Sequence, residues 1–592
     1  MKQIFNLSCG LVNWRIGALA KAAKMPKNIN KPTYQCANAQ TGLFKYLLLP
    51  LFLLVFMGSC SEDFLEVEPV DRLTADNFFK TESEIKAATA SLYGFPWFDY
   101  NDKFAWCAGD CMSGDLYHTW DQEGQFFYFS FNSGNAHLSS GWKGLFRVIS
   151  YSNSIINDMP RAAEGNVPQE VIDEALGEAR FIRGMAYFIL SEYWGEVPIV
   201  ENSTAIVVSN DFFLPKNTRT TVLEFIRRDL EFAAQHLPAS DTPGRVTKWS
   251  ALGLLAKLHL TMASDLDAPK SSENFELAKQ FAAEVINNSG LALLPNYADI
   301  FRYDNNNNQE SLFALQWMEG SYALGNSRQA NWARSSLITG NTEAWGGGKC
   351  MTYDFVQRMD GGDRRQPAIY MSNGDYYPEI RKNDGGYTYY IVNRDPDDPN
   401  TILEGATPVL NSLKKYIIGS NEDTDGGVST GQATRINTIL LRLADVYLVY
   451  AEAAMGAQGY TNDPTALEYF NAVRERAGLP PKSDITFMDV LLERRVEFAL
   501  EGINWFDIKR YYYRDPAGAL AYLNSMEREV TYYRDNSPGA ADENSVEGYI
   551  LNPPNTPITI SESQMWLPIP SAEVVANPLL GPDQPAEDYD FN

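Results

Sequence analysis

The sequence predicts a mainly α-helical protein, in which paired helices form a scaffold and a loop-rich portion is built onto it. Between residues 142 and 287, five segments repeat their apolar residues at nearly 3.6-residue spacing, which is typical of amphipathic helices. Gly or Pro stands between many of these segments, so consecutive helices are expected to pair as in an α-solenoid. From residue 304 to 435 the chain is instead rich in Asn, Asp and Gly, which favours exposed loops.

Residues 1–59 are predicted to be a signal peptide of the lipoprotein type. Tyr46–Met57 is an apolar run of 12 residues, too short to cross a bilayer as a helix, and Gly58 and Ser59 then lead to Cys60. Small residues before a cysteine resemble a bacterial lipobox, in which the cysteine is lipidated and becomes the mature N-terminus. The first lipobox position holds Met where Leu is usual, and translation from Met25 would shorten the leader. The alternative is a short buried helix with a chance cysteine.

Helices and one long aromatic stretch follow. A short helix is expected over residues 83–93, after which Gly94 and Pro96 open a segment of Trp, Phe and Tyr set among Gly, Asp and Asn, which we interpret as loop. Beyond it the apolar spacing predicts the helices Trp142–Asp158, Pro168–Tyr193, Thr221–His236, Lys248–Ala263 and Phe275–Asn287.

One stretch of the loop-rich portion resembles a calcium-binding loop. Asn421, Asp423, Asp425 and Gly426 match the start of an EF-hand loop, but Gln432 stands where a bidentate glutamate is needed. No metal is therefore expected there.

Residues 436–510 predict three helices joined by short turns. Ile439–Met455 is apolar almost all round, which predicts a buried helix; two more are expected over Pro464–Ala477 and Asp489–Leu500, ending before glycine. In the third helix, glutamates spaced i, i+4 and i+8 alternate with arginines. They are either a catalytic carboxylate pair or an ion-pair network between helices, and we favour the network because neighbouring arginines keep carboxylates ionised. The residues concerned are Arg442, Asp445, Arg474, Arg476, Glu493, Arg494, Arg495, Glu497 and Glu501.

Composition excludes several classes of protein. The 49 basic and 75 acidic residues give a net charge of −26, which repels nucleic acid. The chain has four histidines and no HExxH motif, so few residues are available as ligands for a zinc centre. After Cys60, three cysteines remain, of which Cys107 and Cys111 could pair if the chain between them bends suitably. No cofactor is expected.

Six segments, taken in order, resemble the SusD/RagB family of Bacteroidetes outer-membrane lipoproteins. They are ARFIRGMAYFILSEYWGEVPIV, GRVTKWSALGLLAKLHL, RLADVYLVYAEA, NAVRERAGLP, ERRVEFALEGINWFDIKRY and WLPIPSAEVVANPLL. The resemblance covers nearly all of the chain after Cys60. It implies a SusD-like fold with tetratricopeptide-like helix pairs, an N-terminal helical region over 60–303, and a C-terminal region over 304–592 with variable loops at 304–435. Acidic residues after Cys60 resemble the signal that sends such lipoproteins to the cell surface.

The resemblance implies a lipid-anchored protein on the outer face of the outer membrane. Such a protein binds oligosaccharide or polysaccharide and delivers it to a TonB-dependent, SusC-like transporter. A peptide-binding RagB-like protein, a glycoside hydrolase and a purely structural tether are the alternatives. No sugar-cleaving motif is recognisable, so we expect a binding protein rather than an enzyme.

We expect the ligand site where the two loop-rich regions meet, because aromatic rings set among Gly and Asn are less readily explained by helix packing. Aromatic rings would cover sugar faces, and nearby polar groups would fix their orientation. The candidates are Trp97, Trp106, Asp115, Tyr117 and Trp120 from the first region, and Trp317, Tyr322, Asn331, Trp332, Arg334 and Trp345 from the second.

Overall fold

The computed structural model describes residues 78–591, apart from 211, 406–408 and 429–431. The predicted signal peptide, Cys60 and the acidic segment after it lie outside the described residues. No helix in the described part of the chain is long and apolar enough to span a bilayer.

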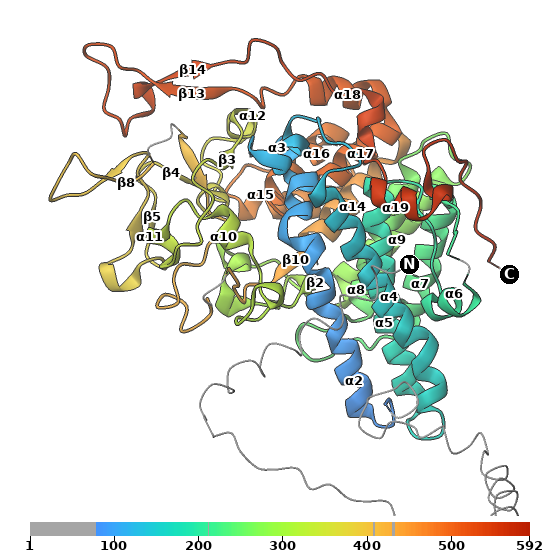
Figure 1. Cartoon of the computed structure of the whole chain (residues 1–592). Helices are drawn as coiled ribbons and strands as arrows, with labels where there is room; N and C mark the ends of the chain where they lie inside the picture. Colours follow the sequence, from blue (N-terminus) through green and yellow to red (C-terminus); the bar gives the residue numbers. More distant parts are fainter. Residues whose placement is uncertain (1–77, 211, 406–408, 429–431, 592) are drawn as a thin grey trace, which may run out of the picture. The chain divides into compact units, whose positions relative to one another are not determined.

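A row of helices forms the scaffold, as predicted from the apolar spacing. Each helix of this row packs on the next helix of the row (Figure 1). This holds even for α9 and α14, although about 150 residues separate them in sequence. In the central helix α5, every residue from Gly177 to Tyr193 except Arg180 is buried. The row consists of α4 (Ala136–Ala163), α5 (Gln169–Tyr193), α7 (Arg219–His236), α8 (Lys248–Ala263), α9 (Ser271–Asn288), α14 (Leu443–Met455) and α15 (Pro464–Arg476).

The aromatic stretch after α2 (Glu82–Ala90) is mostly helical and mostly buried, so its interpretation as loop was wrong for most of its length. It contains the π-helical turns η4 (Tyr100–Phe104) and η5 (Cys107–Cys111), the strand β1 (Leu116–Tyr117) and the helix α3 (Asp121–Phe127). A Cβ atom on Gly109 would lie 2.4 Å from the backbone of Gly502, so the two segments touch backbone to backbone. Cys107 and Cys111 are buried and free.

Strand β10 (Thr438–Arg442) corrects the prediction that a helix begins at Ile439. It pairs antiparallel with β2 (Ser311–Leu315), and the helix α14 starts only at Leu443. All five residues of β10 are buried. A short apolar run fits a buried strand as well as a helix, so spacing alone did not separate the two. The ladder places the two ends of segment 316–437 side by side.

Segment 316–437 consists of short elements and two-stranded ladders rather than a sheet. Within the segment the strands pair as β4–β9, β5–β6 and β7–β8, and β3 pairs with β1 of the earlier aromatic stretch. The elements are α10 (Arg328–Trp332), α11 (Ser336–Thr339), β3 (Cys350–Met351), α12 (Tyr353–Arg358), α13 (Gln366–Ile369), β4 (Tyr370–Ser372), β5 (Tyr376–Tyr377), β6 (Tyr387–Thr388), β7 (Asn393–Arg394), β8 (Ile402–Glu404) and β9 (Asn411–Leu413).

The C-terminal part of the chain packs against the scaffold. After α16 (Phe487–Glu497), α17 (Asn504–Arg514) and α18 (Pro516–Asn524), strands β13 (Thr531–Arg534) and β14 (Tyr549–Asn552) form a hairpin, and α19 (Ser571–Ala576) follows. The tail then runs along the N-terminal helices: Leu567 N donates to Tyr193 O, and Trp194 Nε1 donates to Pro568 O. The proline-rich tail therefore lies along the helical scaffold.

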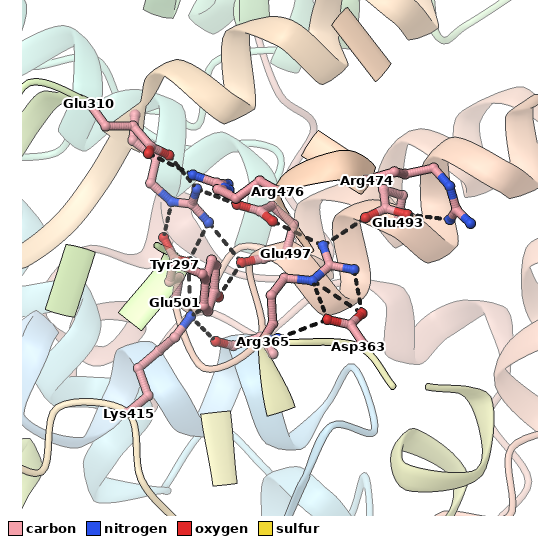
Figure 2. Close-up of polar contacts among 12 residues, drawn as sticks. Tyr297, Glu310, Asp363, Arg365, Lys415, Arg474, Arg476, Glu493, Glu497 and Glu501 are labelled. Atoms are coloured by element: carbon pink, nitrogen blue, oxygen red, sulfur yellow. Dashed lines mark hydrogen bonds and ion pairs between the residues drawn. The ribbon is translucent and has the colours of Figure 1, made fainter. Parts of the chain in front are cut away.

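A buried ion-pair network joins the helices, as predicted (Figure 2). Glu497 lies at its centre and accepts from Arg442 at 2.6 Å, from Arg365 at 2.9 Å and from Arg476. The charges of these arginines overcome the cost of burial and hold the pKa of Glu497 far below its usual value. Glu501 lies beyond the end of α16, so it does not share a helix face with Glu497, yet it accepts from Arg442 at 2.8 Å.

Arg494 belongs to a separate buried cluster. Its Nη1 lies 2.7 Å from Asp445 Oδ1, and its Nε lies 3.0 Å from Asp507 Oδ2, although neither contact has the angle of a hydrogen bond. Lys257 donates to Asp445 at 2.7 Å, and Arg510 to Asp507 at 2.7 Å. The cluster therefore ties α8, α14, α16 and α17 together.

Candidate functional site

A pocket of about 770 Å³ opens between the aromatic stretch that follows α2 and segment 316–437. Part of its wall consists of Tyr117, Thr119 and Trp120, and residues between 334 and 411 form most of the remainder. The C-terminal hairpin completes it with Val530, Thr531, Tyr532 and Val546. A volume of this size suits an oligomeric or drug-sized ligand.

The lining is aromatic and almost uncharged. Among the described residues, 25 line the pocket; six of these are aromatic, and only Arg334 is charged, although charged residues make up 21% of the whole chain. Neutral hydroxyl and amide groups supply the polar part of the wall: Thr119, Thr352, Gln357, Ser372, Asn373, Asn411 and Thr531.

Trp120 is the most exposed aromatic side chain of the pocket, at 76%. It precedes α3, and the buried carboxylate of Glu123 in the first turn of α3 holds that turn. Glu123 lies 2.7 Å from His118 Nε2 and accepts from Lys103. Burial alone would raise the pKa of Glu123, but the hydrogen bond with His118 and the charges of Lys349 and Lys103 lower it to about 2. The turn that presents Trp120 is therefore fixed by a permanently charged group.

Trp345 is the second exposed tryptophan of the pocket, at 48%. Its backbone N–H donates to Ala330 O at 2.8 Å, which seats its loop against α10. A Cβ atom on the next residue, Gly346, would lie 2.0 Å from Trp332 O. Only glycine permits this close approach, so Gly346 has a packing role beside the pocket.

Arg334 mainly stabilises the wall of the pocket. Its Nη1 donates to Tyr390 O at 2.6 Å, its Nη2 donates to Ile391 O at 2.5 Å, and its guanidinium lies over the ring of Tyr389. Its Nε is buried without a hydrogen-bond partner in the described part of the chain.

Comparisons with known proteins identify the family. A model described as "SusD family" matches residues 280–584, and one described as "Starch-binding associating with outer membrane" matches residues 63–260. A SusD-like protein of Bacteroides ovatus is 34% identical over 564 residues, covering 93% of this chain and 98% of that protein. The chain belongs to the SusD family. Its fold is the mainly helical SusD-like fold.

Two further similarities concern other SusD-family members and a solved structure. SusD-like protein P25 of Formosa agariphila is 24% identical over 463 residues, covering 73% of this chain and 81% of that protein. A crystal structure described as being with xylogluco-oligosaccharide has 35% sequence identity and a TM-score of 0.76, covering 86% of this chain and 99% of that one.

Seven of the eleven candidate residues do not line this SusD-family pocket. Four of the seven are buried tryptophans whose rings pack on other aromatic side chains: Trp97, Trp106, Trp317 and Trp332. The indole N–H of Trp97 donates to Leu92 O, that of Trp106 to Asp102 O, and that of Trp317 to Thr438 Oγ1. Asp115 is buried against Arg495 at 2.7 Å, and Asn331 is buried within α10. Tyr322 is 39% exposed, but its hydroxyl donates to Asp102 at 2.7 Å.

Four candidates do line the pocket, and sequence reasoning missed several neighbours. Tyr117, Trp120, Arg334 and Trp345 are in its wall, together with Tyr353, Tyr370 and Tyr532, which we had not named. The run of β-branched and aromatic residues at 530–533 was a usable signal for a strand. Nothing local indicated that this strand faces residues near 350.

In the calcium-like loop, Asp423 is occupied by protein donors. Its Oδ1 accepts from Lys382 N at 2.8 Å, and its Oδ2 from Ser420 N at 2.8 Å. The carboxylate therefore stabilises the loop.

Proposed function

We propose that this SusD-family protein binds a neutral oligosaccharide or polysaccharide in the pocket and delivers it to a TonB-dependent transporter of the outer membrane. The observation that carries the proposal is the lining, whose described residues include six aromatic side chains and a single charge. Flat rings cover the apolar face of a pyranose, while neutral hydroxyl and amide groups bond its hydroxyls. The 35% identical relative solved with xylogluco-oligosaccharide supports the same ligand class.

The same lining disfavours the alternatives. A peptide ligand brings charged termini and side chains, for which the pocket offers only Arg334, whose Nη1 and Nη2 already bond backbone carbonyls. Hydrolysis of a glycoside typically needs two carboxyl groups flanking the bond. Among the described residues, the lining includes no Asp or Glu, and Glu493, Glu497 and Glu501 are buried in ion pairs.

Outer-membrane association fits the description of the matching family model. We propose that a lipid on Cys60 provides the attachment and that the protein faces the cell exterior. A SusC-like transporter is then the partner that takes up the ligand. Extraction of native membranes in mild detergent, followed by pull-down, should recover a large β-barrel protein; its absence would leave a glycan-binding protein without the proposed delivery role.

Ligand binding is tested with a glycan array followed by calorimetry on Trp120→Ala and Trp345→Ala. Each loss should weaken binding by roughly 1 to 4 kcal/mol, about five-fold to 800-fold in Kd, if the ring behaves as an interface hot spot. Tyr460→Ala is the matched control, because Tyr460 is an aromatic residue of similar exposure, 47%, that does not line the pocket. Co-purified peptides without any glycan retention would overturn the proposal.

A further inference from the structure

A second pocket, of about 510 Å³, opens at the other end of the β4–β9 ladder from the pocket described above. The first pocket reaches the Ser372–Asn411 pair at one end of this ladder. Ala368 and Lys414, which line the second pocket, lie along the chain beyond the Tyr370–Leu413 pair at the other end. The two pockets share none of their described lining residues. The volume of the second pocket is also within the range of small-ligand sites.

The lining of this second pocket, the charged pocket, differs in chemistry from that of the first. Among the described residues, 20 line it and eight of these are charged, compared with one of 25 in the first pocket. Five are cations and three are carboxylates, whereas the whole chain has a net charge of −26. The eight are Asp299, Arg302, Asp304, Arg364, Glu379, Lys382, Lys414 and Lys415. A net positive lining on an acidic protein favours an anionic ligand.

Three of the five cations already have partners within the protein. Arg302 donates to Asp304 through both Nε and Nη2, at 3.0 and 2.7 Å. Lys415 points into the buried ion-pair network and donates to Glu501 at 3.0 Å (Figure 2). Lys382 Nζ donates to a backbone carbonyl. An anion in the charged pocket therefore depends on the remaining two cations.

Lys414 is the first of these two. Its Nζ donates to Ile417 O at 3.0 Å and lies 3.2 Å from Glu379 Oε1, so one of its three N–H groups remains for a ligand. The Glu379 side chain is 41% exposed, and water therefore weakens this ion pair. Burial lowers the pKa of Lys414, which means that a second anion nearby would stabilise its charged form.

Arg364 is the second. Its guanidinium has no hydrogen bond or ion pair in the described part of the chain, and its side chain is exposed. Packing and its backbone hold it instead: Arg364 N donates to Ala477 O at 2.9 Å, and a Cβ atom on Gly478 would lie 2.7 Å from Arg364 Nε. A planar guanidinium can bond both oxygens of a carboxylate, so Arg364 suits an acidic group on a ligand.

The charged pocket also offers an aromatic ring and a free acceptor. Tyr376 is 57% exposed, and its hydroxyl donates to Gly385 O at 2.8 Å. A Cβ atom on Gly386 would lie 2.5 Å from the ring, so the ring rests on glycine backbone. Such a ring can cover a pyranose face. The carboxylate of Asp299 has no hydrogen bond or ion pair in the described part of the chain and can accept from sugar hydroxyls.

We propose that the charged pocket is a second saccharide site, in which Arg364 and Lys414 bind a carboxylate or sulfate group of the sugar and Tyr376 covers its ring. That the anion is carried by a saccharide rests on the proposed function. An acidic peptide would also meet the two cations, but it has no ring of hydroxyls for Tyr376 and Asp299. The protein then has one pocket for neutral sugars and another for acidic ones.

A glycan array with oligogalacturonates, glucuronate-bearing xylo-oligosaccharides and sulfated galacto-oligosaccharides tests the inference, and its uronate and sulfate arms separate the two anionic groups. Calorimetry then compares each bound acid with its neutral counterpart, a methyl ester or a desulfated form. Wild type should bind the acid about tenfold or more tightly than the neutral form. This margin should shrink between about 50 and 500 mM NaCl, because salt screens exposed charges.

Arg364→Gln and Lys414→Met should each weaken binding of the acid by about tenfold or more and leave neutral glycans in the first pocket unaffected. Arg228→Gln removes an exposed arginine that lines neither pocket, and it should behave as wild type. Trp120→Ala should keep the acid.

Four results would overturn the charged pocket as a saccharide site. They are no acidic glycan bound on the array, wild-type affinity for the acid in both charge variants, loss of the acid in Trp120→Ala instead, and binding of acidic peptides in place of acidic glycans. Failure of the proposed function is a separate observation: no neutral glycan is bound on the array, whatever happens to the acidic ones.

Discussion

Replacing Glu497 with glutamine should destabilise the protein without altering its ligand site. Arg365, Arg442 and Arg476 all donate to this carboxylate, whose side chain is fully buried. Arginine has no acceptor, so the amide nitrogen of glutamine would face only donors. Breaking a buried ion pair typically costs about 3 to 5 kcal/mol. With an unfolding entropy of about 2.1 cal/mol/K per residue over roughly 500 residues, a loss of 4 kcal/mol lowers Tm by about 4 °C.

The assay is thermal unfolding of Glu497→Gln between pH 3 and pH 8, with Glu475→Gln as the exposed control of the same charge change. Because the folded-state pKa of Glu497 is depressed, its stabilisation is fully present above the unfolded pKa of about 4.3 and is lost as pH falls toward the folded value. The Tm difference should therefore narrow below about pH 4. An equal Tm for both variants would refute the network as a source of stability, and a selective loss of glycan binding in a fully stable Glu497→Gln would show that the site is misplaced.

The remaining predictions concern the anchor and one buried tryptophan. Cys60→Ala should move the protein from the membrane fraction to the soluble fraction, and continued attachment would contradict lipidation at this residue. Trp97→Ala should cost about 3 to 5 kcal/mol of stability, because Trp97 is fully buried against Phe313, while glycan affinity per folded molecule stays at the wild-type value in calorimetry.

Local patterns predicted the scaffold well, and four of the eleven candidate residues lie in the wall of the pocket. Apolar spacing found helices such as α5 and α8 within a few residues, because this pattern depends on neighbours one turn away. The Glu–Arg alternation in α16 correctly indicated ion pairs, but their partners, such as Arg474 for Glu493, lie on other elements and could not be assigned from spacing. The burial of Trp97 and Trp332 could not be predicted from such local patterns. The small and polar residues around them are compatible with loops as well as with π-helical turns or short helices. Tyr532 meets Tyr353 across 178 residues of chain, a contact created by tertiary packing alone.

The β2–β10 ladder has a consequence for how ligand range can change in evolution. Residues 316–437 leave the scaffold and return to it at adjacent strands, so their two ends are fixed whatever lies between them. The entropy of closing such a loop grows only with the logarithm of its length, by about 0.6 kcal/mol for each doubling. Insertions and deletions in the loops of this segment therefore cost the scaffold little, whereas Arg365 and Lys415, which pair with Glu497 and Glu501, have to be kept. New glycan specificities could be acquired by changing the loops between such fixed residues while the helices and their buried charges stay unchanged.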